Sequence, residues 1–211
     1  MSHYFVNDNN VKSDKRNLYF EFKGNRFKFV SDNGVFSKNE IDEGSALLLK
    51  TYVENGKNGR VLDVGAGVGV IGVVISKIND CDVDMLEINK RAVDLCSENI
   101  VINGVNKCKV YESNIYEKAN GSYDVVVSNP PIRAGKKVVF EILEKSKEYL
   151  SDEGELWVVI RKNQGADSAK KKLIEVFGNC ECVKKDKGFY ILKSIKVWNI
   201  YERKLIKFPF Y

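Results

Sequence analysis

The feature that most constrains how this chain can fold is the segment from Arg60 to Gly72, which reads R-V-L-D-V-G-A-G-V-G-V-I-G. A short apolar run, typical of a buried parallel strand, leads directly into glycines at positions 65, 67, 69 and 72 before a helical pattern begins. Glycine lets the chain turn sharply, and it lets backbone N–H groups approach a ligand with no Cβ atom in the way. The segment therefore predicts a ligand-binding turn between a strand and a helix.

Two ligands compete for this turn. The spacing Gly67-x-Gly69-x-x-Gly72 satisfies the dinucleotide fingerprint, in which the N-terminus of a helix receives a pyrophosphate. Asp63 favours a different ligand, because an acid at the end of the first strand repels a pyrophosphate and suits a cationic head. The ammonium and sulfonium groups of S-adenosylmethionine form such a head. The spacing Asp63-x-Gly65-x-Gly67-x-Gly69 resembles motif I of class I methyltransferases.

From residue 60 onward, strand and helix patterns alternate, which predicts an α/β fold with a doubly wound, mostly parallel sheet covered by helices on both faces. The last two strands are joined by the short connection Asp186-Lys187-Gly188 and must be antiparallel. Asn89 is the expected N-cap of the second helix of this series. We expect strands over 60–64, 82–87, 107–112, 123–128, 155–160, 180–185 and 188–197, and helices over 70–78, 90–102, 136–150 and 165–177.

The region before the glycine turn predicts a small annex. Residues 17–31 alternate aromatic and polar side chains around Lys23-Gly24-Asn25, which indicates a β-hairpin. A helix capped by Asp42 or Ser45 should follow, and Phe36 lies at the tip of a loop that could close over a ligand. We expect one domain over 1–211, with the hairpin and cap in 1–54, the catalytic core in 60–197 and a tail in 198–211.

Composition excludes several kinds of chemistry. The chain has 211 residues, 44% of them hydrophobic, which is enough for a full-sized core, and its net charge of +5 is compatible with a polyanionic partner. His3 is the only histidine, which removes most zinc-ligand sets and histidine bases, so no metal is expected. Five cysteines without a C-x-x-C pair, no long apolar run and no signal pattern predict a cytoplasmic protein with no membrane contact. A monomer is favoured.

The motif with the clearest chemistry is S-N-P-P-I, Ser128 to Ile132, directly after the strand at 123–128. The two prolines withhold N–H donors, so the carbonyl groups around them stay free to accept hydrogen bonds. If the Asn129 side-chain oxygen and the Pro130 carbonyl each accept one N–H of a planar amino group, they hold its nitrogen toward a sulfonium methyl. Orientation and stabilisation of developing positive charge then suffice for transfer, without a strong base.

Two further polar residues follow strands at the same predicted edge of the sheet. Glu87 ends the second strand about 20 residues after the glycine turn, where a carboxylate can accept hydrogen bonds from both hydroxyls of a ribose. Asn114 follows the third strand, where methyltransferases of this type often carry an acid that accepts from the adenine amino group; the asparagine oxygen can still accept.

The string N-P-P-I-R-A-G-K-K, with G-V-F-S-K-N-E-I-D-E-G-S upstream and G-E-L-W-V-V-I downstream, resembles the RsmC-like family of class I methyltransferases. The resemblance implies a seven-stranded Rossmann-like sheet with an antiparallel last strand, S-adenosylmethionine as donor, and guanine N2 of small-subunit ribosomal RNA as acceptor. Ile132 replaces the aromatic residue of the N-P-P-[YFW] motif, so the stacking partner of the base must lie elsewhere, with Phe36 one candidate. The expected site comprises Asn129, Pro130, Pro131 and Ile132 for catalysis, Asp63, Gly65, Ala66, Gly67, Gly69, Glu87, Ile88, Asn114, Ile115, Asn129 and Phe36 for the cofactor, and Arg133, Lys136 and Lys137 for RNA.

Three alternatives stay open at this point. A protein glutamine methyltransferase uses the same amide geometry. A nicotinamide-dependent oxidoreductase would use the Gly67-x-Gly69-x-x-Gly72 fingerprint, and it is disfavoured by Asp63 and by the lack of a usable histidine. A non-catalytic RNA-binding module would keep the fold alone.

Overall fold

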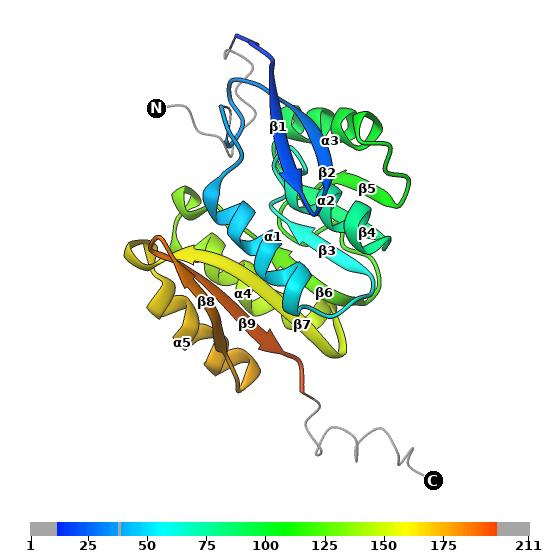
Figure 1. Ribbon diagram of the computed structural model, residues 1–211. Helices are drawn as coiled ribbons and strands as arrows, with labels where there is room; N and C mark the ends of the chain where they lie inside the picture. The colour runs from blue at the N-terminus through cyan, green and yellow to red at the C-terminus, as the bar shows by residue number, and fades with distance from the viewer. Residues whose placement is uncertain (1–11, 38, 198–211) are drawn as a thin grey trace.

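The main element of the computed structural model, which describes residues 12–37 and 39–197, is a seven-stranded sheet (Figure 1). Its order is β5-β4-β3-β6-β7-β9-β8; the first five strands run parallel, and β9 runs antiparallel to both β7 and β8. The predicted Rossmann-like sheet is confirmed, whereas His3 and the predicted tail at 198–211 lie outside the described residues. The strands are β3 (Val61–Val64), β4 (Val83–Glu87), β5 (Cys108–Glu112), β6 (Tyr123–Ser128), β7 (Leu150–Arg161), β8 (Glu181–Asp186) and β9 (Phe189–Ile195).

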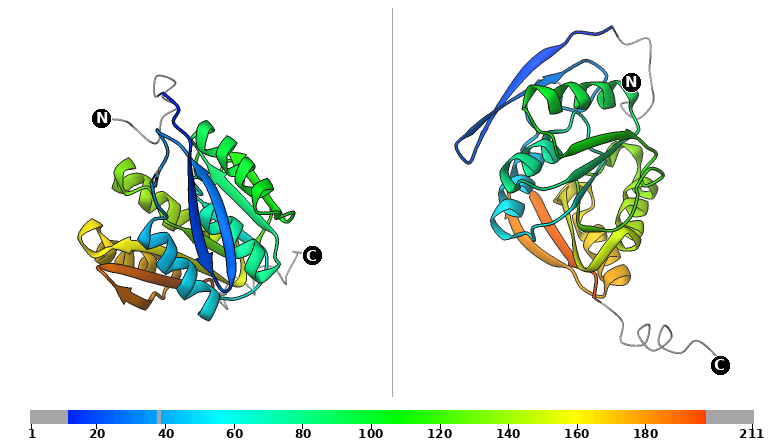
Figure 2. Two further views of the ribbon diagram at one scale, coloured as in Figure 1. Left: turned by 45° about the horizontal axis from the view of Figure 1, so that its top comes forward. Right: turned by 90° about the vertical axis from the view of Figure 1, so that its right-hand side faces the viewer.

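Helices cover both faces of the sheet (Figure 2). Three helices pack on one face over a core that includes Val61 and Trp157, and two pack on the other over a core that includes Leu62 and Val158. Alternate residues of each strand supply the two cores, because successive side chains point to opposite faces. The first group is α1 (Glu43–Asn55), α2 (Val70–Asn79) and α3 (Lys90–Ile102), and the second is α4 (Lys136–Tyr149) and α5 (Ala166–Phe177).

The order of the strands creates a switch point between β3 and β6. From β3 the chain proceeds through β4 to β5 at one edge, and it then returns to β6 and builds the other half of the sheet. Ser128 at the end of β6 ties the two strands together, because its hydroxyl donates to the carbonyl of Val64 at 2.7 Å. Ligands of open α/β sheets bind at such a point, beyond the carboxyl ends of the strands.

The predicted hairpin is confirmed as β1 (Arg16–Phe22) and β2 (Asn25–Ser31), which form a separate two-stranded sheet. Its turn has positive φ at Lys23 and Gly24, as a type I′ turn requires. The hairpin lies along α3, where the amide of Asn99 accepts from the N–H of Val30 at 2.7 Å and donates to its carbonyl at 3.0 Å (Figure 2). The Asn99 side chain thus makes the two backbone hydrogen bonds to Val30 that a neighbouring strand would otherwise make.

One strand boundary differs from the sequence-based expectation, and one choice that the sequence left open is settled. Strand β7 begins at Leu150 rather than at 155, because Leu150 pairs with Tyr123 before an irregularity in the register. The first helix of the fold, α1, begins at Glu43 with Asp42 as its N-cap, which decides between the two expected caps. Within the described part of the chain, no helix is long and apolar enough to cross a membrane.

Candidate active site

The glycine turn after β3 forms the floor of the site. Gly67 has a φ of 58°, and an added Cβ there would have no neighbour within 4 Å, so its backbone faces open space. Gly72 serves a different purpose, because a Cβ there would lie 2.4 Å from the sulfur of Met85 and would push α2 away from β4. The turn therefore combines a bare backbone surface with close helix–strand packing, as the sequence predicts.

Asp63, predicted to favour a cationic ligand, lies beneath this turn. Its side chain is fully buried on the α2 side of the sheet, where Oδ2 accepts from the N–H of Gly72 at 3.0 Å. Because residue 63 sits inside the strand, its side chain alternates toward α2 rather than toward the edge of the sheet. The carboxylate thus accepts a hydrogen bond from one of the N–H groups in the first turn of α2 that have no partner within the helix.

The buried position of Asp63 has an electrostatic consequence. Burial raises the pKa of Asp63 to about 7, and the nearby charge of Glu87 adds to the rise, while the hydrogen bond from Gly72 opposes it. Its other oxygen, Oδ1, has no hydrogen-bond partner and is the single buried side-chain polar atom in this state among the described residues. An acid at the start of α2 disfavours a pyrophosphate there and favours a ligand with positive charge.

Glu87 ends β4 and bridges the glycine turn and α3. Its Oε2 accepts from the N–H of Gly67 and its Oε1 from the N–H of Asn89, both at 2.8 Å. Burial raises its pKa, while these backbone hydrogen bonds lower it. A carboxylate has about four acceptor positions, so each oxygen can accept a further hydrogen bond from a ligand hydroxyl.

Asn129 follows β6 directly and faces the start of α1. Its Nδ2 donates to the carboxylate of Asp42 and to the hydroxyl of Ser45, both at 2.9 Å. Its Oδ1 accepts no hydrogen bond from the described residues and stays available to a ligand. In the turn that follows Asn129, the N–H of Ala134 donates to the carbonyl of Pro131 at 2.9 Å. The Pro130 carbonyl takes no part in that hydrogen bond.

These elements surround a cavity of about 540 Å³, within the range of small-molecule sites. Most of the predicted residues line it, whereas Asp63, Gly69, Lys136 and Lys137 do not; both lysines are exposed at the start of α4. Asn114 lines the cavity, and its Nδ2 donates to Glu117 at 3.3 Å, so its oxygen can accept. The predicted residues that line the cavity are Phe36, Gly65, Ala66, Gly67, Glu87, Ile88, Asn114, Ile115, Asn129, Pro130, Pro131, Ile132 and Arg133.

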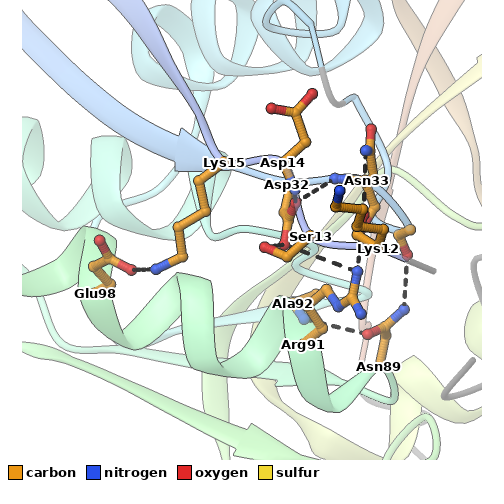
Figure 3. Close-up of polar contacts among 11 residues, drawn as sticks. Lys12, Ser13, Asp14, Lys15, Asp32, Asn33, Asn89, Arg91, Ala92 and Glu98 are labelled. Atoms are coloured by element: carbon orange, nitrogen blue, oxygen red, sulfur yellow. Dashed lines mark hydrogen bonds and ion pairs between the residues drawn. The ribbon is translucent and has the colours of Figure 1, made fainter. Parts of the chain in front are cut away.

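The loop that carries Phe36 is fastened to the start of α3. The Nδ2 of Asn89 donates to the carbonyl of Gly34 at 3.1 Å, and Arg91 donates to the carbonyl of Asn33 at 2.7 Å (Figure 3). The segment before β1 contacts the same helix, because Lys15 forms an ion pair with Glu98 of α3 at 2.6 Å. Phe36 lines the cavity while 51% of its surface remains exposed, a position from which an aromatic ring can contact an entering ligand.

Sequence reasoning missed several residues of the site. The sequence predicts only a helix cap at Asp42 or Ser45, although the G-V-F-S-K-N-E-I-D-E-G-S segment that contains them also carries Phe36. Arg161 at the end of β7 and Phe189 at the start of β9 pair in adjacent strands, and the guanidinium of Arg161 lies 4.0 Å from the centre of the Phe189 ring. No local pattern marks these two, since strand pairing alone brings them to the cavity.

Comparison with known proteins shows the family of this chain. A family profile described as "Methyltransferase small domain" matches residues 26–193, which include all but the first residue of the hairpin strand β2, the glycine turn and the N-P-P motif. The chain belongs to this methyltransferase family. Its donor is S-adenosylmethionine, and the dinucleotide alternative is not supported.

Relatives of this methyltransferase include proteins of similar and of greater length. The protein YbxB of Bacillus subtilis is 45% identical over 198 residues, which cover 92% of this chain and 98% of that protein. The ribosomal RNA small subunit methyltransferase C of Aliivibrio fischeri is 35% identical over 181 residues, which cover 83% of this chain and 52% of that protein. The methyltransferase thus spans about half the length of the second relative.

The fold of the methyltransferase matches that of a solved relative. The structure of a T. thermophilus 16S rRNA N2 methyltransferase, RsmC, in complex with AdoMet and guanosine superimposes with a TM-score of 0.78 over 86% of this chain and 50% of that one. The two chains are 22% identical, so this likeness concerns the fold. The site fits the cofactor chemically, because the cavity offers a bare glycine backbone and a strand-end carboxylate, and beneath the glycine turn lies a buried acid with one unpartnered oxygen, which suits a cationic group.

Proposed function

We propose that this methyltransferase transfers a methyl group from S-adenosylmethionine to the N2 amino group of a guanine in small-subunit ribosomal RNA. The observation that carries the proposal is the orientation of the Asn129 amide. Its nitrogen donates to Asp42 and Ser45, so its oxygen is the atom left to accept from a ligand in the cavity that these three residues line. An acceptor at this place suits an incoming amino group.

The chemistry requires little more than correct placement. The lone pair of an exocyclic amino nitrogen is delocalised into the ring, so the nitrogen is a poor nucleophile. Asn129 Oδ1 and the Pro130 carbonyl each accept one N–H and turn the lone pair toward the methyl carbon. The nitrogen forms the new N–C bond, the electrons of the C–S bond go to sulfur, and the extra proton leaves to water. Acceptors that are fixed in advance stabilise the positive charge as it develops on nitrogen.

The other half of the cavity would hold the donor. Glu87 would accept from the ribose hydroxyls, because both of its oxygens already point into the region between the glycine turn and α3. Asn114 would accept from the adenine amino group. Gly65 to Gly67 would contact the methionine part, and Asp63 would supply negative charge from below. These roles match the sequence-based predictions, except that Asp63 acts through the turn.

Basic side chains at the mouth support RNA as the acceptor. Arg133 and Arg161 line the cavity, and Lys136 and Lys137 stand exposed at the start of α4 beside it. Such side chains bind phosphates next to a target nucleotide. The relatives named above as ribosomal RNA methyltransferases support the same class of substrate. Because a guanine is stacked within RNA, the enzyme must take an unpaired base or flip it out, and Phe36 is the exposed ring available to stack on it.

The test combines binding and transfer on one protein sample. Calorimetry with S-adenosylhomocysteine measures the affinity of the donor half of the cavity for the cofactor product. Transfer of tritiated methyl to small ribosomal subunits that lack native modifications measures whether the acceptor half takes RNA. Label recovered as N2-methylguanosine supports the proposal. Label in protein instead would identify the glutamine alternative, which uses the same amide geometry. Binding without any transfer would favour a non-catalytic RNA-binding module.

A further inference from the structure

The start of α1 contacts the amide nitrogen of Asn129 at the wall of the cavity, which Asp42, Ser45 and Asn129 all line. Asp42 Oδ2 accepts from Asn129 Nδ2 at 2.9 Å and also from the backbone N–H of Ser45 at 2.8 Å. The hydroxyl of Ser45 takes the second hydrogen of the same Nδ2 at 2.9 Å, and Ser45 is buried. Both hydrogens of the amide are therefore directed at α1, across 87 residues of sequence in the case of Asp42.

The two contacts differ in what they specify. A hydroxyl can donate or accept, so Ser45 would tolerate either end of the Asn129 amide. A carboxylate only accepts, so Asp42 excludes the flipped amide, which would place two oxygen atoms in contact. Asp42 is thus the group that determines which atom of Asn129 is left to accept from a ligand. A charged acceptor on Nδ2 also polarises the amide and makes its oxygen a better acceptor.

Asp42 itself is held firmly. It caps α1, and the next part of the helix packs so tightly that a Cβ on Gly44 would lie 2.8 Å from the ring of Phe189. Further along the helix, the ring of Tyr52 packs edge-on against Trp157 of β7. The carboxylate therefore has a fixed position relative to β6, as a group that orients a catalytic side chain requires.

We propose that Asp42 is a positioning residue for methyl transfer, which holds the Asn129 amide with its oxygen toward the amino group of the acceptor. The inference rests on the proposed role of Asn129. It also gives the segment before the glycine turn a part in catalysis, in addition to its place as a structural annex.

The test separates this role from helix capping. In Asp42→Ser the hydroxyl still caps α1, because serine is a good N-cap, but it is too short and uncharged to hold Asn129. Asp42→Asn keeps an acceptor for both partners and loses the charge. Thr51→Ala is a matched control, because it removes a 2.8 Å hydrogen bond to Leu47 within the same helix, away from the cavity. Each variant is assayed for S-adenosylhomocysteine binding, melting temperature, kcat and KM.

We expect Asp42→Ser to lower kcat by roughly ten- to a hundredfold, since a misoriented amide loses much of its transition-state contact. Its melting temperature and its affinity for S-adenosylhomocysteine should stay near those of the unmodified protein. Asp42→Asn should recover part of the loss in kcat, and Thr51→Ala should lower the melting temperature with kcat unchanged. An Asp42→Ser protein with full kcat would overturn the inference.

A double-mutant cycle with Asn129→Ala gives the second readout. If Asp42 acts through Asn129, Asp42→Ser should have no further effect on kcat once Asn129 is alanine, because residues that act as a unit are not additive. Equal losses in both backgrounds would contradict the inference. An Asn129→Ala protein with full activity would instead overturn the proposed role of Asn129, so the two failures are distinguishable.

Discussion

The charge of Asp63 should destabilise the free protein above neutral pH, and its replacement by asparagine should reveal this. The side chain is fully buried, and burial raises its pKa from the ordinary 3.8 to about 7. The folded protein therefore binds a proton between about pH 4 and pH 7 that the unfolded chain has lost, so the free energy of unfolding falls as pH rises through this window. Above pH 7 the accumulated loss is about 4 kcal/mol.

Asp63→Asn removes this titration and keeps an oxygen that can accept from the N–H of Gly72. The new amide N–H₂ takes the place of the unpartnered Oδ1 and has no acceptor of its own, which costs about 1–3 kcal/mol. At pH 8.5 the variant should thus be more stable than the unmodified protein by roughly 1–3 kcal/mol, or about 2–10 °C in melting temperature. Below pH 5 this advantage should vanish, because Asp63 is then protonated in the folded protein.

Urea denaturation of both proteins at pH 5 and pH 8.5, without cofactor, measures this difference. Other titrating groups are shared by the two proteins and cancel in the comparison. A stability difference that does not depend on pH would show that Asp63 titrates at its ordinary pKa. A variant that is less stable at pH 8.5 would show that the ionised carboxylate is a net stabilising group, which would refute the reasoning.

Four further predictions address the rest of the site and the fold. Asn129→Ala should leave S-adenosylhomocysteine binding intact and lower methyl transfer at least about a hundredfold, the scale of one lost transition-state acceptor; unchanged transfer in the labelling assay would exclude the catalytic role. Glu87→Gln should weaken S-adenosylmethionine binding by about tenfold or more in calorimetry, because a charged acceptor of ribose hydroxyls is lost. Asn99→Ala should lower the free energy of unfolding by about 2–4 kcal/mol in urea, since this buried amide makes three hydrogen bonds to the backbone of Val30 and of the glycine turn. Lys137→Ala should reduce the slope of log K for RNA binding against log salt concentration by about one, the value for one lost phosphate contact, without changing kcat. An unaltered slope would show that this lysine does not contact the RNA.

Much of the framework follows from local patterns in the chain. The apolar run before Gly65 and the N-cap at Asn89 were recognisable because strands and helix starts depend on neighbouring residues. The turn at Lys23-Gly24 was recognisable for the same reason. Glu87 and Asn129, which the sequence predicts at one edge of the sheet, both line the cavity, because the carboxyl ends of parallel strands converge there.

Other parts of the site depend on contacts that no local pattern reports. The direction of the Asp63 side chain follows from the pleat of β3 and from the place where α2 packs, so its distance from the cavity could not be read from the motif alone. Arg161 and Phe189 meet only because β9 pairs antiparallel with β7.

The sequence by itself determined the order of strands and helices, the glycine turn, and the amide that follows β6, because each depends on residues within a few positions of one another. Only the tertiary structure decided which residues hold that amide. Asp42 reaches Asn129 because α1 packs across the sheet with its N-terminus at the switch point, a placement set by burial of the helix against β7 and α2. The orientation of the proposed catalytic amide is thus a property of packing, since its partner lies far away along the chain.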